Sequence, residues 1–308
     1  MAFANPTAAA TAADMVAVIG EVWSDLVLMP NFANAVASNF FTDLSSFASE
    51  GGDYIHVPNI YTNIFTASTQ STSGNGVVDQ SPTQVDVTLN ITTHKYVAWI
   101  IGDLEMAQMF KKFDINEKYV TIAKSVLIDE LEASLFGLWS GLSTNVVGDT
   151  ATVLTDNEIV GAISQLDTLN YDVMNKAAFF FHPFVYWRQV ATIAKYYTFN
   201  TSQLPIIRDG NFGKADNSRG LRGQIYGIPI YTSTNVVKGL STYRNLLAMP
   251  EAFAFAMQTR GGGKVRSQVQ YMLQNLGTLA VVDIIYGVVE LRDAAAVLIN
   301  ANDTLITS

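Results

Sequence analysis

The chain has 308 residues, which is long enough for two domains or for one large elaborated domain. Charged residues are only 15% of the sequence, and no stretch contains the roughly 18 consecutive apolar residues of a membrane-spanning helix. Cysteine is absent, which excludes disulfides, thiolate metal ligands and cysteine nucleophiles. We therefore expect a core-rich protein with no membrane partner.

The negative charge is concentrated in the first third of the sequence. Residues 1–94 contain eight acidic side chains and no lysine or arginine, so they carry −8 of the net charge of −9. The missing basic residues argue against a signal peptide, an arginine-rich transit peptide and a basic arm that binds nucleic acid. A charged partner of this region should be basic, and a second copy of the chain is one candidate.

The first residues predict an arm that leads into a helix. Residues 1–15 are small and rich in alanine and threonine, which is typical of a segment that is loose or is ordered by a partner. Residues 16–41 have a helical pattern of apolar positions, broken at Pro30.

Two strand patterns follow. Residues 54–65 and 85–91 are predicted to be strands, and the polar residues 66–82 between them cannot build a core. We expect residues 54–100 to form two long strands joined at a flexible tip. Because a long hairpin with few anchors is marginally stable, it should lie on its own domain or on a neighbouring subunit.

The longest helix signal lies at residues 114–141. Asp114 and Glu117 have the spacing of a capping box, and Gly141 is placed to end the helix. An apolar residue recurs every four positions and makes one stripe, which should pack against a sheet: Ala123, Leu127, Leu131, Leu135 and Trp139. The other faces carry acidic side chains that we interpret as solvated: Asp129, Glu130 and Glu132.

Helices then alternate with short strands, which is typical of an α/β or α+β unit. The expected elements are a helix from Thr155 to Leu169 that begins with a second capping box at Glu158, a buried strand at residues 177–181, a helix after Pro183 at residues 184–197, a loop at residues 198–223 and a bent or edge strand at residues 224–231. The end of the chain returns to β patterns, at residues 265–273, 278–285, 288–291 and 296–299. These last strands are natural partners for the long helix, so the unit between them would be an insertion.

No combination of residues predicts catalysis, a metal ion or a cofactor. His56, His94 and His182 have no partner at metal-ligand spacing, and we interpret them as solvated or structural. The run at residues 261–264 (GGGK) resembles a phosphate-binding loop only weakly, because Val265 follows it in place of serine or threonine. We therefore expect a protein that is not an enzyme.

Nine of the 18 basic residues lie between Arg208 and Arg266. They form either an ordinary loop surface or a positive face that meets a neighbour's acidic residues or a polyanion. No aromatic residues are interleaved to stack on bases.

Several stretches, taken in this order, are similar to those of one family. They are GGDYIHVPNI at residues 51–60, DLEMA at 103–107, SVLIDELEASLF at 125–136, AAFFFHPFVYWRQV at 177–190, GQIYGIPIYTSTNV at 223–236 and YGVVELRDAAAVLI at 286–299. In this order they resemble a tailed-bacteriophage major capsid protein of the Hong Kong 97 fold, over most of residues 16–300.

The resemblance implies an α+β fold in five parts. These are an N-terminal arm and helix at residues 1–53, an extended β-hairpin loop at 54–101, the spine-helix part of a peripheral domain at 102–146, an inserted α/β axial domain at 147–262, and peripheral-domain strands with the C-terminus at 263–308.

The resemblance also implies a structural protein that self-assembles into pentamers and hexamers of an icosahedral shell around double-stranded DNA, in a virion assembled in the host cytoplasm. The hairpin would lie across a neighbouring subunit, and the acidic first third would dock on basic neighbour surfaces. Further implied partners are a portal, decoration proteins and a separate scaffolding protein, because no charged helical scaffolding segment precedes Val16.

A set of aromatic and charged side chains is expected at subunit interfaces: Trp23, Asp79, Asp86, Lys95, Lys111, Lys112, Arg219 and Arg222. Some relatives cross-link lysine to asparagine between subunits. Lys95 is the only lysine in or beside the hairpin, and its place at the base argues against that chemistry.

Three alternatives remain open. An encapsulin-like compartment of the same fold would store a cargo enzyme rather than DNA. An enzyme built on the α/β unit would act as a soluble monomer. A receptor-binding or tail protein would form tubes or fibres.

Overall fold

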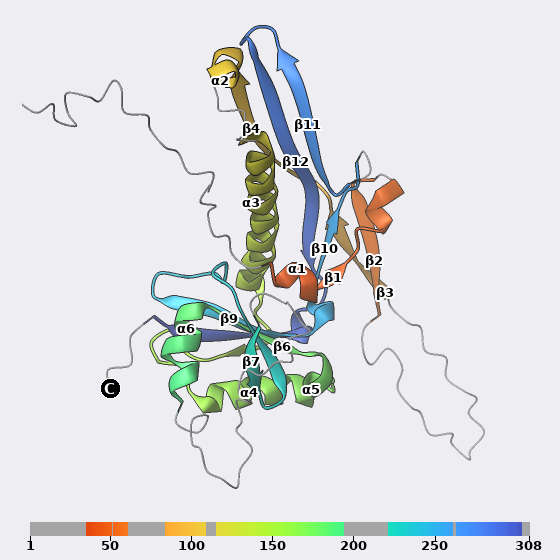
Figure 1. The fold of residues 1–308 in the computed structure, drawn as a ribbon. Coiled ribbons are helices and arrows are strands. Elements are labelled where there is room, and N and C mark those ends of the chain that lie inside the picture. Colours follow the sequence, from red (N-terminus) through yellow and green to blue (C-terminus); the bar gives the residue numbers. More distant parts are fainter. Residues whose placement is uncertain are drawn as a thin grey trace, which may run out of the picture.

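The computed structural model describes residues 35–50, 52–60, 84–108, 115–193, 221–260 and 263–303. The described chain forms two sheets and a separate two-stranded hairpin (Figure 1). A long helix runs along the first sheet, and the second sheet lies beyond the foot of that helix. In the part of the chain that is described, no helix is long and apolar enough to cross a membrane.

The long helix, α3, spans Ile115–Leu138 and ends in the 3-10 turn Trp139–Gly141. All five residues of the predicted stripe are buried, which confirms the helical period. Asp114, the first residue of the expected capping box, lies outside the described residues. The interpretation of Glu132 as solvated is wrong, because its side chain is buried.

The five-stranded sheet has β12 at its centre. One edge of β12 pairs with β4, and the other edge pairs first with β11 and then with β10, which lies beyond the end of β11. The strands are β1 (Thr42–Asp43), β4 (Thr93–Gly102), β10 (Phe253–Met257), β11 (Val265–Met272) and β12 (Gly277–Glu290). The helix α3 packs on β12 and β4, as the apolar stripe predicts. The short helix α2 (Asp103–Gln108) follows β4 at the far end of the sheet (Figure 1).

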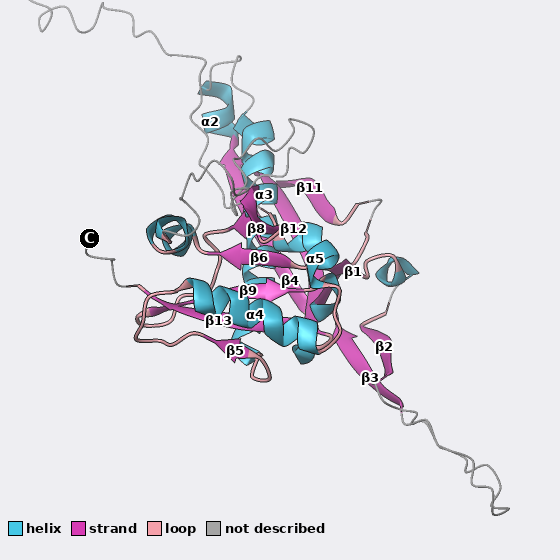
Figure 2. Ribbon diagram, turned by 90° about the horizontal axis from the view of Figure 1, so that it is seen from below, coloured by secondary structure: helices cyan, strands magenta, loops and turns pink. Residues whose placement is uncertain are grey.

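The six-stranded sheet has the order β5-β13-β9-β6-β8-β7. Its strands are β5 (Val146–Val147), β6 (Ala178–Phe181), β7 (Leu221–Ile225), β8 (Ile228–Thr232), β9 (Thr242–Ala248) and β13 (Ala296–Asn302). Figure 2 shows α4 (Asp156–Thr168) and α5 (Val173–Lys176) on the face that points away from α3. The capping box of Thr155 and Glu158 is present at the start of α4, as predicted.

Two predicted elements of this unit are wrong in detail. The helix expected at residues 184–197 is shorter, because α6 (Pro183–Arg188) ends in the 3-10 turn Val190–Thr192 and the residues after 193 are not described. The bent strand at residues 224–231 is a hairpin of β7 and β8. Tyr226 and Gly227 both have positive φ, so the chain reverses at the point where we expected a bend.

The two sheets do not divide the chain at the expected boundaries. β10 comes from the range expected for the inserted unit, yet it pairs with β12. The last strand, β13, comes from the range expected for the peripheral domain, yet it pairs with β9 in the six-stranded sheet. β4 was expected in the hairpin and belongs to the five-stranded sheet instead. For β4 and β13 the strand pattern is correct and the pairing partner is not, whereas no strand is predicted at the residues of β10.

The separate hairpin consists of β2 (Tyr54–Ile60) and β3 (Gln84–Asn90), paired antiparallel. Residues 61–83, with the predicted tip, lie outside the described residues. Before the hairpin come the short helix α1 (Ala37–Phe40), β1 and the 3-10 turn Phe47–Glu50. Of the helix predicted at residues 16–41, only its last residues are described.

Candidate assembly interface

The base of the hairpin is fixed to the body of the protein. Leu89 and Ile91 are buried against Ala254 and Ala256 of β10, in a small core separate from the main one. At Gly287 the backbone of β3 comes so close that a Cβ would collide with the oxygen of Asn90. The hairpin therefore leaves the body in a defined direction.

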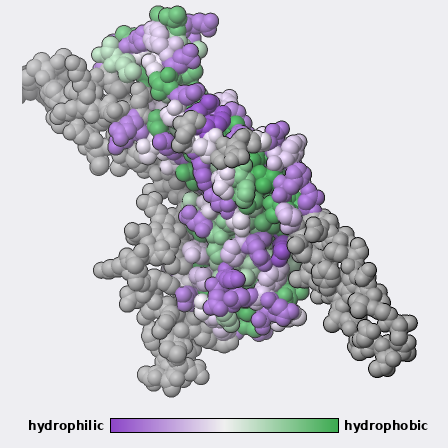
Figure 3. Space-filling view, turned by 90° about the vertical axis from the view of Figure 1, so that its right-hand side faces the viewer, coloured by the Kyte–Doolittle hydropathy of each residue, from purple (hydrophilic) through white to green (hydrophobic). Residues whose placement is uncertain are grey.

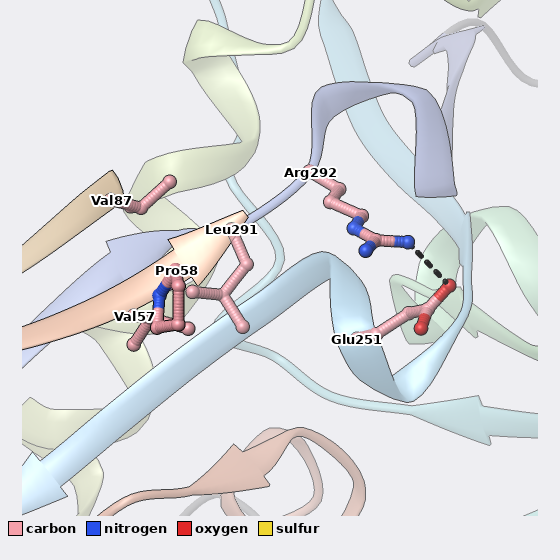
Figure 4. Close-up of a pocket in the computed structure, with 6 residues that line it drawn as sticks. All are labelled: Val57, Pro58, Val87, Glu251, Leu291 and Arg292. Carbon is pink, nitrogen blue, oxygen red and sulfur yellow. Dashed lines mark ion pairs between the residues drawn. The ribbon is translucent and has the colours of Figure 1, made fainter. Parts of the chain in front are cut away.

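A shallow hollow of about 120 Å³ separates the hairpin from the end of β12 (Figure 4). Val57, Pro58 and Val87 of the hairpin face Leu291, and the ion pair of Arg292 with Glu251, 3.6 Å long, closes the other side. Ligand pockets usually have roughly 300 Å³ or more. The hollow is thus too small for a substrate.

Several described residues of the hairpin are exposed. Tyr54 has 59% of its surface accessible, and the imidazole of His56 faces solvent beside Asp86, with 2.7 Å between Nδ1 and Oδ2. The hydrogen bond from His56 lowers the pKa of Asp86. An exposed two-stranded ribbon has little stability of its own, so contact with another surface would stabilise it.

The five-stranded sheet also has an uncovered face. Along β4, Val97 and Trp99 pack on the main core beneath α3, whereas Tyr96 and Ile100 point the other way and are 69% and 45% exposed. Figure 3 shows the side of the molecule where the hairpin and β11 lie, with hydrophobic residues interspersed among hydrophilic ones. The described chain thus presents both an exposed hairpin and an uncovered sheet face.

A buried carboxylate on the central strand organises that face. Asp283 of β12 accepts hydrogen bonds from Arg266 at 3.0 and 3.1 Å and from Arg260 at 2.5 Å, and its Oδ2 lies 2.8 Å from Nε2 of His94. Burial alone would raise the pKa of Asp283, but the bonds from Arg266, His94 and Arg260 outweigh it and lower the pKa to about 2. One ionised side chain thus joins β4, β11 and the β10–β11 connection.

Two histidines and the glycine run have structural partners. His94 is paired with Asp283, and His182 accepts a hydrogen bond from the backbone N–H of Phe184 at the start of α6, so both have structural roles. Lys264, which ends the glycine run, lies 2.7 Å from Oδ2 of Asp43 and stabilises a turn. The described residues contain no group of three or more side chains that could hold a metal ion.

Most of the predicted interface residues cannot be placed. Those outside the described residues are Trp23, Asp79, Lys111, Lys112 and Arg219. Asp86 lies on the hairpin, Lys95 pairs with Glu130 of α3 at 2.9 Å, and Arg222 on β7 donates to the hydroxyl of Thr232 at 3.0 Å. These three lie on different elements and do not form one cluster.

The sequence analysis did not identify the structural roles of two residues, Asp283 and Glu132. Asp283 is the only charged residue in the run TLAVVDIIYGVV at residues 278–289, and that isolation is a signal, because a charge in a buried strand needs partners. Glu132 lies beside the leucine stripe and gives no such signal.

No protein-family model matches the sequence, and no curated protein matches it at a significant level. Solved structures do match. The capsid structure of Cyanophage P-SCSP1u superimposes with a TM-score of 0.68 at 14% identity over 94% of both chains. A structure from Mycobacterium phage Che8 gives 0.66 at 18% identity, covering 92% of this chain and 97% of the other. The chain has the Hong Kong 97 capsid fold.

The Hong Kong 97 fold extends over nearly the whole chain. The capsid of Ralstonia phage GP4 matches with a TM-score of 0.65 at 15% identity, covering 100% of this chain and 99% of that one. An encapsulin complex from Synechococcus elongatus matches with 0.61 at 12% identity, covering 98% of each chain. The predicted α+β class and fold family are confirmed, and the structures that share the fold include phage capsids and an encapsulin complex.

Proposed function

We propose that this chain is the major capsid protein of a tailed bacteriophage, and that it assembles through pentamers and hexamers into an icosahedral shell around double-stranded DNA. The observation that carries the proposal is the end-to-end similarity to phage capsid structures. The exposed hairpin and the uncovered sheet face support it, because they are surfaces that a neighbouring subunit can cover.

The partners follow from this role. Copies of the same chain form the shell, and a scaffolding protein, a portal and decoration proteins act with it. The DNA is confined rather than bound by sequence. The protein acts in the virion and is not an enzyme.

The second candidate is a cellular compartment that stores a cargo enzyme. The similarity to the encapsulin complex favours it over the remaining alternatives, although phage capsids give higher TM-scores. Both candidates require closed shells, and they differ in what the shells contain.

Electron microscopy of the protein, expressed alone and with its neighbouring genes, tests the proposal. We expect closed shells, alone or with a co-expressed scaffold, and nuclease-protected DNA in particles from the complete set of genes. Shells that hold a single co-purified enzyme and no DNA would favour the compartment. A compact monomer under every condition would contradict both.

A further inference from the structure

The segment before β1 lies between the two sheets. Phe41 packs on Phe180 of the six-stranded sheet with ring centres 5.5 Å apart, and on Phe253 of the five-stranded sheet at 5.1 Å. Phe40 contacts the same Phe180 at 5.2 Å and Tyr231 at 6.4 Å. Phe40 at the end of α1 and Phe41 at its C-cap thus contact both sheets between them, and we call this pair of rings the wedge.

One buried carboxylate holds this wedge in place. Oε2 of Glu132 accepts hydrogen bonds from the backbone N–H groups of Val36 at 3.1 Å and Ala37 at 2.9 Å, and Oε1 accepts one from Ser38 at 2.7 Å. The first turn of α1 has no side-chain cap of its own, so Glu132 replaces it from 95 residues away in the sequence.

Burial of a carboxylate at this position has a cost in desolvation free energy. Glu132 is only 1% exposed and lies next to the apolar stripe of α3. Burial raises the pKa of Glu132, although the hydrogen bonds from Ser38, Ala37 and Val36 oppose that effect. A leucine would pack here without any desolvation cost, but it would leave two buried N–H groups and one half-buried N–H group without their acceptor. The carboxylate therefore stabilises the start of α1 and does not improve the packing of α3.

We propose that Glu132 is the positioning residue for the angle between the two sheets, because its carboxylate fixes α1 and so keeps Phe41 between β6 and β10, with Phe40 beside it on β6 and β8. The consequence for assembly rests on the proposed function. A closed shell needs subunits of one shape, since each interface must repeat around the symmetry axes. Loosening the wedge should leave a folded subunit whose two units vary in orientation.

The test uses the full-length chain with Glu132→Ala and Glu132→Gln. A matched control is Glu130→Ala, which removes the same charge from an exposed position of α3, where Glu130 pairs only with Lys95 among the described ion pairs. Hydrogen exchange of residues 36–38 reports on the anchor, and electron microscopy of the particles reports on shell uniformity.

We expect Glu132→Ala to raise the exchange rates of these three amides by roughly tenfold or more, since their buried acceptor is lost. Glu132→Gln should have an intermediate effect, because one oxygen can still accept from Val36 and Ala37 while the amide nitrogen faces Ser38. The control should match the wild type. Particles of both Glu132 variants should be heterogeneous in diameter or incompletely closed.

Unchanged exchange in both Glu132 variants would overturn the anchor. Faster exchange together with uniform, wild-type shells would overturn its role in assembly. If Glu132→Ala fails to fold, Glu132→Gln decides both points. If the wild type itself forms no shells, the proposed function fails, and the exchange rates still decide whether Glu132 holds α1.

Discussion

The two sheets of this protein differ in how completely one chain covers them. All four residues of β6 and six of the seven residues of β9 are buried in the six-stranded sheet. In the five-stranded sheet, β11 contains no buried residue, and β4 contains only Ile101. Within the described chain, the six-stranded sheet is covered on both faces, whereas the five-stranded sheet has one uncovered face.

The covering elements explain this difference. Helix α4 packs on β13 and α5 on β8, while the aromatic cluster around Phe180 fills the opposite face. The five-stranded sheet has α3 on one side, and among the described residues only the base of the hairpin packs on the other. Subunit stability should therefore depend most on the buried groups of both sheets, above all those of the six-stranded sheet, whereas assembly should depend on the exposed face of the five-stranded sheet and on the hairpin.

The largest effect on stability is expected from Phe180→Ala. Phe180 is 1% exposed, so truncation should lower the free energy of unfolding by about 3–5 kcal/mol through lost burial and a cavity. Val269→Ala on β11, at a position 65% exposed, is the matched control and should change it by less than about 0.5 kcal/mol. Urea unfolding measures both, and equal effects would contradict the difference between the sheets.

Asp283→Asn should have the next largest effect. It should lower the free energy of unfolding by about 2–4 kcal/mol at pH 7, because Arg260 and Arg266 lose the carboxylate with which they pair. The folded pKa of about 2 lies below the ordinary value of 3.8, so ionised Asp283 stabilises the protein above about pH 4. That stabilisation is lost as the pH falls through about 2. Urea midpoints of the two proteins should therefore converge between pH 4 and 2, and a constant difference would refute the pKa.

Deletion of residues 66–82 should leave the subunit folded, with a change in unfolding free energy below about 0.5 kcal/mol. Shell assembly or shell stability should be impaired, because the hairpin would no longer reach across a neighbour. Circular dichroism and sedimentation measure the two effects, and a glycine–serine segment of equal length is the control. Loss of the soluble fold would show that the tip serves its own subunit.

The smallest effect on subunit stability is expected from Lys95→Ala. Its ion pair with Glu130 is about half exposed on both sides, and such pairs contribute little. The urea midpoint should not change measurably, and Glu130→Ala should behave in the same way. A defect of Lys95→Ala, and not of Glu130→Ala, should instead appear in the yield of shells, and wild-type yield would remove Lys95 from the proposed interface.

Local signals in the sequence predicted local structure well. The four-residue period of α3, the capping box at Thr155 and the strand patterns of β2, β3 and β11 are each set by neighbouring residues. Strand pairing is different. The residue pattern of β13 predicts a strand, but it does not predict that β9 is the neighbouring strand. The sheet to which a strand belongs therefore could not be read from its own residues.

The same reasoning explains which site residues were missed. Glu132 binds backbone groups about 95 residues away, and a backbone N–H has no sequence signature. Asp283 was detectable as a lone charge in an apolar strand, but its partners lie on other strands and in a turn. Interface residues are harder still, because their partners belong to another molecule.

A cryo-EM reconstruction of particles purified after co-expression with the neighbouring genes tests the central claim most directly. We predict a closed icosahedral shell in which the exposed side chains of residues 54–60 and 84–90 of each subunit contact an adjacent subunit. A shell in which the hairpin folds back on its own five-stranded sheet would contradict its role between subunits. A homogeneous monomer under all conditions would contradict the shell itself.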